Sequence, residues 1–288
     1  MRDSYVESRL EFLRRSQNPD GGWGYFPGKQ SWMEPTVYAM LALGYPRRDA
    51  AIDSALQRSR TWRRPDGSWR PGEQVFDSTW VTALGILLEP EAASVRWLMG
   101  VSGQESRLIV RLASFFHFLK TDVNVNHRGW PWRPGNSAWV EPTALTLLAL
   151  KKAGSGKADA AIRARLLEGE ELLFSRRGRD GGWSAGNPNV LNVDVPSYPE
   201  TTAIALIGLQ GRRTEDLAGP LAVARGYYQD RQPALASAWL QIALRCYGDS
   251  PRPPMENVGA LSDIYLCSLQ AIGHPDGNHQ FFRCGGRA

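Results

Sequence analysis

The sequence predicts an all-α protein built as an array of helical hairpins. Hydrophobic residues recur with a helical period along most of the chain, and strand-like alternation is nearly absent. A short plan also repeats: a glycine–tryptophan turn, a linker, an acidic residue, and an apolar helix with Thr two places after the acid. The four copies pair Trp23 with Glu34, Trp69 with Asp77, Trp130 with Glu141, and Trp183 with Glu200. Such a unit cannot bury its apolar face alone, so the copies must stack on one another.

The helices are expected in two kinds. Six segments rich in Ala and Leu nearly all the way round are predicted to be buried inner helices: Glu34–Gly44, Asp77–Leu88, Glu141–Lys151, Glu200–Leu209, Leu235–Tyr247 and Asp263–Gly273. More amphipathic segments are predicted to be outer helices: residues 4–16, 48–62, 105–120, 158–175 and 215–229. Periodicity alone leaves two shapes open, an open superhelix and a closed double ring.

Composition excludes several classes of protein. A net charge of +5, with basic residues scattered over linkers and helix ends, predicts no nucleic-acid binding. Three cysteines without a CxxC spacing, and a start without a signal-peptide core, favour a cytoplasmic protein with reduced thiols. The longest apolar run, Leu108–Leu119, is interrupted by Arg111 and His117 and is too short to span a membrane, which leaves a peripheral membrane contact as an alternative.

One segment carries a family resemblance. Leu13, Gln17, Gly21 and Trp23 have the spacing of the QW motif, and the sequence resembles the superfamily of terpenoid cyclases and protein prenyltransferases. The resemblance is clear over residues 5–210 and degenerate over 211–288. It implies a single (α/α)6 toroid, a double ring of inner and outer helices, formed by the whole chain, residues 1–288.

The resemblance also bears on chemistry. Val75-Phe76-Asp77-Ser78-Thr79 aligns with the DxDD motif of class II terpene cyclases, so that Asp77 matches the proton donor, although Val75 and Ser78 replace two of the acids. Prenyltransferase β subunits use a zinc site with an Asp-x-Cys pair, which has no counterpart here. A cyclase-like enzyme that acts on a polyprenyl or similar apolar substrate, without a metal or a cofactor, is therefore expected.

The acids of the repeat admit two interpretations. Pro35 and Pro142 suit the first helical position, which would make Glu34 and Glu141 structural N-caps. In a closed ring, however, the inner helices run parallel, so all the acids would meet at one mouth. Carboxylates crowded in a partly apolar funnel have raised pKa values, and a neutral carboxylic acid against aromatic walls is suited to protonate an alkene.

The predicted site follows from this geometry. Asp77 is the expected proton donor, and the acids expected to tune it are Glu34, Glu141 and Glu200. The residues expected to line the substrate site are Trp32, Trp80, Trp139, Tyr198, Tyr265 and Asp263. Aromatic faces attract cations and would suit a carbocation. The insert Asn187–Val195 is predicted to be a loop over the mouth that acts as a lid.

Two other functions stay open at this point. A non-catalytic toroid that binds a lipid or a protein partner would leave the lumen filled and the acids in helix caps. A carbohydrate-active (α/α)6 barrel would need two acids facing each other across a polar groove at roughly 5–10 Å. A chain with residues for only one barrel would, as an enzyme, use its own lumen, form a homodimer, or borrow a partner domain.

Overall fold

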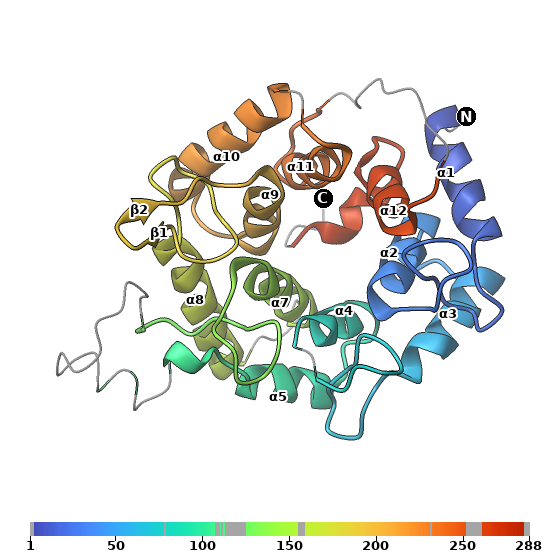
Figure 1. The fold of residues 1–288 in the computed structure, drawn as a ribbon, viewed down its shortest axis with the longest axis horizontal. Helices are drawn as coiled ribbons and strands as arrows, with labels where there is room; N and C mark the ends of the chain where they lie inside the picture. Colours follow the sequence, from blue (N-terminus) through green and yellow to red (C-terminus); the bar gives the residue numbers. More distant parts are fainter. Residues whose placement is uncertain are drawn as a thin grey trace.

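The computed structural model describes residues 3–77, 79–106, 110, 112, 125–154, 159–230, 232–251 and 261–284. Viewed down its shortest axis, the chain forms two concentric rings of helices (Figure 1). The inner ring consists of α2 (Met33–Leu43), α4 (Trp80–Leu88), α7 (Val140–Ala153), α9 (Pro199–Gly208), α11 (Ala234–Cys246) and α12 (Ile264–Gly273). The outer helices are α1 (Ser4–Arg15), α3 (Ala50–Arg60), α5 (Ala92–Gly100), α8 (Ala160–Ser175) and α10 (Thr214–Gln229).

The inner ring is closed. Each inner helix packs against the next in chain order, and α12 packs back against α2. The predicted toroid is therefore confirmed, and so are the six inner helices. The predicted outer helix at 105–120 lies largely outside the described residues, which include a short 3-10 helix at Gln104–Ser106 and the helical residues 110 and 112. The sequence analysis missed α5.

Hydrogen bonds between the linkers tie the N-terminal ends of the inner helices together at one mouth. The N–H of Met33 donates to Pro71 O at 2.8 Å, and the N–H of Val140 donates to Ala185 O at 3.1 Å. An equivalent hydrogen bond closes the ring: the N–H of Ile264 donates to Tyr25 O at 2.9 Å. Each bond joins one repeat to the linker of the next, so the repeat itself builds the mouth.

The C-terminal segment closes the opposite end of the ring. It contains the short 3-10 helix η2 (His279–Phe282), which lies inside the ring beside α11 (Figure 1). Phe282 is fully buried, and its carbonyl accepts a hydrogen bond from Gln210 at 2.7 Å. Lys152 donates to the carbonyl of Phe281 at 2.6 Å. The described C-terminal segment therefore packs at the end of the ring opposite the N-termini of the inner helices.

None of the described helices is both long and apolar enough to cross a membrane. The three cysteines, Cys246, Cys267 and Cys284, are free.

Candidate functional site

The repeated tryptophan and threonine fix the positions of four inner helices, α2, α4, α7 and α9. The N–H of Trp23 donates to Thr36 Oγ1 at 2.9 Å, and Trp130 makes the same bond to Thr143. Trp183 bonds Thr202 in the same way at 3.0 Å. All of these groups are buried, where an unpaired N–H would be costly. The Thr therefore recurs because it satisfies the backbone of the turn, and it marks equivalent positions in the repeats.

The second repeat has a different register from the one that the sequence predicts. Trp69 donates to Thr82 Oγ1 at 3.0 Å, whereas Thr79 Oγ1 is buried without a partner among the described residues. The position equivalent to Glu34 and Glu141 is therefore Trp80. Asp77 lies three residues before it in the sequence. The expectation that Asp77 shares the register of the other acids is wrong, because Asp77-x-Thr79 only imitates the acid-x-Thr pair.

Asp77 lies on the rim of the mouth. Its side chain is 58% exposed, and its Oδ2 lies 3.6 Å from Arg133 Nη2. Helix α4 begins at Trp80, so Asp77 stands in the linker before the helix. The ring of Trp80 meets that of Trp132 edge-on at 5.6 Å between centroids.

Glu34 stands at the centre of a polar and aromatic cluster. The hydroxyl of Tyr25 donates to Glu34 Oε2, and the Tyr265 hydroxyl is a second hydrogen-bond partner of the carboxyl. Burial raises the pKa of Glu34 to about 7, even though both tyrosines stabilise the carboxylate, and the charge of Asp263 raises it further. The two tyrosine rings meet edge-on at 6.4 Å.

Glu141 has no such support. No hydrogen bond or ion pair reaches its carboxyl from the described part of the chain. Burial raises its pKa to about 8, and the negative charges of Glu34 and Glu200 add to the shift. At pH 7 the protonated acid is therefore the main form of Glu141. Three of the acids, from α2, α7 and α9, interact electrostatically at the mouth, whereas the sequence predicts that all the acids of the repeat meet there.

These three acids are not helix caps. The N-cap residues of α2, α7 and α9 are Trp32, Trp139 and Tyr198, and none of the three makes a side-chain cap bond. The glutamates follow two residues later, in the first helical turn, so the expected N-cap positions of Glu34 and Glu141 are wrong. Asp263 does cap its helix, because it accepts a hydrogen bond from the N–H of Leu266 at 2.9 Å. A structural role therefore accounts for Asp263 and not for the glutamates.

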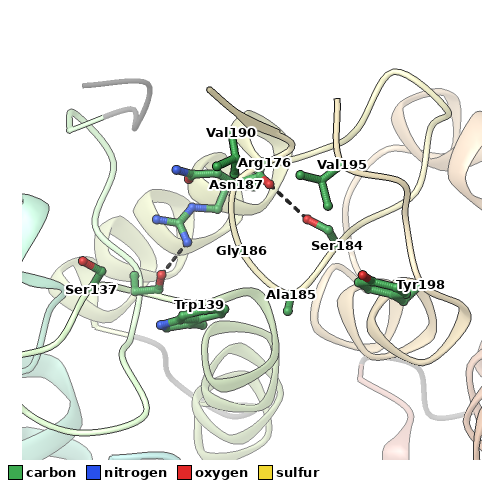
Figure 2. A pocket seen from close by; sticks show the side chains of 11 residues that line it. Ser137, Trp139, Arg176, Ser184, Ala185, Gly186, Asn187, Val190, Val195 and Tyr198 are labelled. Atoms are coloured by element: carbon green, nitrogen blue, oxygen red, sulfur yellow. Dashed lines mark hydrogen bonds between the residues drawn. The ribbon is translucent and has the colours of Figure 1, made fainter. Parts of the chain in front are cut away.

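The aromatic residues complete the mouth. Tyr265 holds the position equivalent to Glu34, since Ile264 makes the same linker bond as Met33. The ring of Trp32 lies against Gly72 in the next linker, and the ring of Trp139 lies against Gly186. Trp139 and Tyr198 also line a cavity of about 390 Å³ between α7 and α9 (Figure 2).

An aromatic column that the sequence analysis missed fills one side of the lumen below Glu34. Tyr38 meets Tyr265 edge-on at 5.1 Å and Trp239 at 5.7 Å, and it stacks on Phe282 at 6.3 Å. Tyr25, which bonds Glu34, belongs to the same cluster and was also missed. Its place two residues after Trp23, at the point where the linkers join, was the available signal.

Comparison with known proteins shows which sequences and structures this chain resembles. No family model matches the chain. The chain is 26% identical over 274 residues to a drimenyl diphosphate synthase of Streptomyces showdoensis, an alignment that covers 93% of the chain. The chain spans about half, 46%, of the length of that relative.

Solved structures agree with the toroid fold of this chain. A variant of the type II terpene cyclase MstE from Scytonema, in complex with geranylgeranyl dihydroxybenzoate, matches with a TM-score of 0.51 and 16% identity, over 98% of this chain and 83% of that one. A GH8 endo-β-1,4-glucanase from an Achatina fulica gut metagenomic library matches with a TM-score of 0.57 and 16% identity, over 93% and 95% of the two chains. At these identities the likeness shows the fold alone.

Proposed function

We propose that this toroid catalyses Brønsted-acid cyclisation or isomerisation of an isoprenoid substrate at its mouth. The observation that carries the proposal is the partly buried Glu141, whose carboxyl has no hydrogen-bond or ion-pair partner among the described residues and whose pKa is raised to about 8. A neutral carboxylic acid of this kind can donate a proton to an alkene at neutral pH. The similarity to drimenyl diphosphate synthase and to a cyclase crystallised with a geranylgeranyl compound supports an isoprenoid as the substrate.

The proposed step uses the residues of the mouth. The Glu141 carboxyl gives its proton to a terminal C=C bond, whose π electrons form the new C–H bond and leave a tertiary carbocation. An internal alkene of the same chain attacks this cation, and a final proton loss to a carboxylate restores neutrality. The faces of Trp80 and Tyr265, at the same level of the ring as Glu141, would stabilise the positive charge. Burial, and then the charges of Glu34 and Glu200, raise the pKa of Glu141 and so favour its protonated form.

Two residues compete for the role of donor, and one assay separates them. Farnesyl diphosphate is incubated with the chain in D₂O, and deuterium in the product is measured by mass spectrometry. With Glu141 as the donor, Glu141→Gln lowers the rate of labelled product formation by at least 100-fold, as expected for the loss of a general acid, and Asp77→Asn leaves it within a factor of a few. The opposite pattern assigns the donor to Asp77, the residue that the sequence aligns with the motif.

A non-catalytic toroid that binds a lipid or a protein is the second candidate. The aromatic column favours it, because Tyr38, Trp239 and Phe282 are buried and leave the lumen floor closed. Unlabelled, unchanged substrate in the D₂O experiment, together with measurable binding, would select this candidate. The carbohydrate-active alternative has only the fold in its favour.

We further propose that the mouth faces a partner, either a second copy of this chain or a partner domain. The exposed large apolar side chains lie mainly on the linkers around the mouth, among them Phe26, Phe76 and Leu191. The relative is about twice as long as this chain, so it has room for a second domain. Light scattering after size exclusion tests this: a dimer that Phe76→Ser converts to a monomer supports a homodimer through the mouth.

A further inference from the structure

The cavity between α7 and α9 lies beside the acids and beneath a small hairpin. Figure 2 shows the rings of Trp139 and Tyr198 on either side of Ala185, with Val190 and Val195 above them. Trp139 and Tyr198 are the N-cap residues of α7 and α9, so Glu141 and Glu200 follow on the first turns of the same helices. The cavity is therefore a side chamber of the mouth.

The two buried polar side chains at the cavity, Arg176 and Ser184, already have partners. Arg176 is buried, donates to the carbonyl of Ala138, and lies 3.1 Å from Glu105 Oε1, which neutralises its charge. Ser184 donates to the carbonyl of Asn187 at 3.2 Å (Figure 2). Because these contacts already occupy the Arg176 guanidinium, Arg176 is not available to bind a phosphate or diphosphate in the cavity. The rest of the cavity lining is mainly aromatic, aliphatic and glycine, and its other polar groups are the side chains of Ser137 and Asn187 and the Tyr198 hydroxyl, which suits a neutral ligand that is largely apolar.

A short β-hairpin with a two-residue turn covers the cavity. Strands β1 (Asn189–Val190) and β2 (Val193–Asp194) pair antiparallel, and Leu191 and Asn192 between them have φ of 53° and 63°. Positive φ at both turn positions is the geometry of a type I′ turn. Leu191 is an unfavourable residue for it and is 84% exposed. Together with Val190 and Val193, it keeps apolar surface at the edge of the chamber in contact with water.

We propose that this chamber binds the hydrocarbon end of an isoprenoid chain, with Trp139 and Tyr198 as its walls and the β1–β2 hairpin as its cover. The volume of about 390 Å³ lies at the low end of the range for ligand sites, which fits one end of a chain and not a whole large substrate. The chain then runs from the chamber to the carboxyl groups of the mouth. The isoprenoid identity of the ligand rests on the proposed function, whereas the apolar character of the chamber does not.

Binding of farnesol, a neutral C15 isoprenoid alcohol, tests the proposal without any turnover. Ala185 is exposed at the chamber, so Ala185→Phe fills the cavity without crowding the core. Ala160→Phe is the matched control, because Ala160 is an exposed residue at the far end of α8. Titration calorimetry is expected to show farnesol binding to the wild type and to Ala160→Phe, and at least tenfold weaker binding to Ala185→Phe.

One further variant and the D₂O assay separate this proposal from the proposed function. Trp139→Ala removes one wall of the chamber and is expected to weaken farnesol binding at least tenfold, whether or not the wild type forms labelled product in D₂O. The proposal for the chamber is wrong if farnesol does not bind the wild type, or if it binds Ala185→Phe as tightly as the wild type. If Ala185→Phe selectively loses farnesol binding but the wild type shows no turnover, the proposal that the chamber binds an isoprenoid stands and the proposed cyclase activity is rejected.

Discussion

Among the acids of the mouth, Glu141 differs from Glu34 because no hydroxyl from the described part of the chain stabilises its charged form. Tyr25 and Tyr265 both form hydrogen bonds to the Glu34 carboxyl. The Glu141 carboxyl is instead buried near the negative charges of neighbouring acids. A carboxyl whose pKa is higher in the folded state than in the unfolded chain is stabilising below the unfolded pKa and loses that effect as pH rises. For Glu141 the window runs from the ordinary 4.5 to about 8.

The consequence is a pH-dependent gain of stability on removing the acid. Glu141→Gln cannot ionise, so its free energy of unfolding should exceed that of the wild type by about 1–3 kcal/mol at pH 9, with the difference shrinking toward zero near pH 4.5. Urea unfolding at a series of pH values measures this. Glu11→Gln, on the outer surface of α1, is expected to follow the wild-type curve. A constant difference between Glu141→Gln and wild type at every pH would contradict the prediction.

At the scale of the element, the threonine ladder decides where a helix begins. In α4 the bond from Trp69 selects Thr82, which leaves the Thr79 hydroxyl buried without a partner among the described residues. Both threonines are fully buried and stand three residues apart, so their side chains differ mainly in this bond.

Valine at each position therefore should give opposite results. Thr82→Val leaves the Trp69 N–H unpaired in the core and is expected to lower the free energy of unfolding by about 1–3 kcal/mol. Thr79→Val replaces an unsatisfied hydroxyl by a methyl group and is expected to be neutral or stabilising by up to about 1 kcal/mol. Urea denaturation midpoints of the two variants provide the measurement. A larger loss in Thr79→Val would restore Asp77 to the acid register.

The same ladder explains what the sequence could and could not predict. Regular spacing from Trp23 to Glu34 and from Trp130 to Glu141 gave the helices and the meeting of the acids. In the second repeat two threonines were available, and only the three-dimensional hydrogen bond distinguishes them. The charge states of Glu34 and Glu141 depend on burial and on neighbours from other repeats, which a local pattern does not contain.

At the scale of the whole molecule, the chain's C-terminal segment completes the ring that the repeats begin. Phe282 packs against Tyr38 from α2 and Trp239 from α11, two helices that are far apart in the sequence. Asn278 donates to the carbonyls of Leu41 and Tyr45 at 2.9 and 2.7 Å, which holds the same segment against the end of α2. The degenerate last third of the chain thus supplies the closure of the lumen floor.

Removing this plug should destabilise the whole toroid while leaving the mouth intact. Phe282→Ala deletes a fully buried ring and is expected to cost about 3–5 kcal/mol, whereas Phe26→Ala, at a position 49% exposed on the mouth, should change stability by less than about 0.5 kcal/mol. Guanidinium unfolding measures both. Because the floor and the side chamber lie on different parts of the ring, folded Phe282→Ala should still bind farnesol with the affinity of the wild type. Loss of farnesol binding in that folded variant would mean that the ligand reaches down the aromatic column, and the assignment of the side chamber would have to be abandoned.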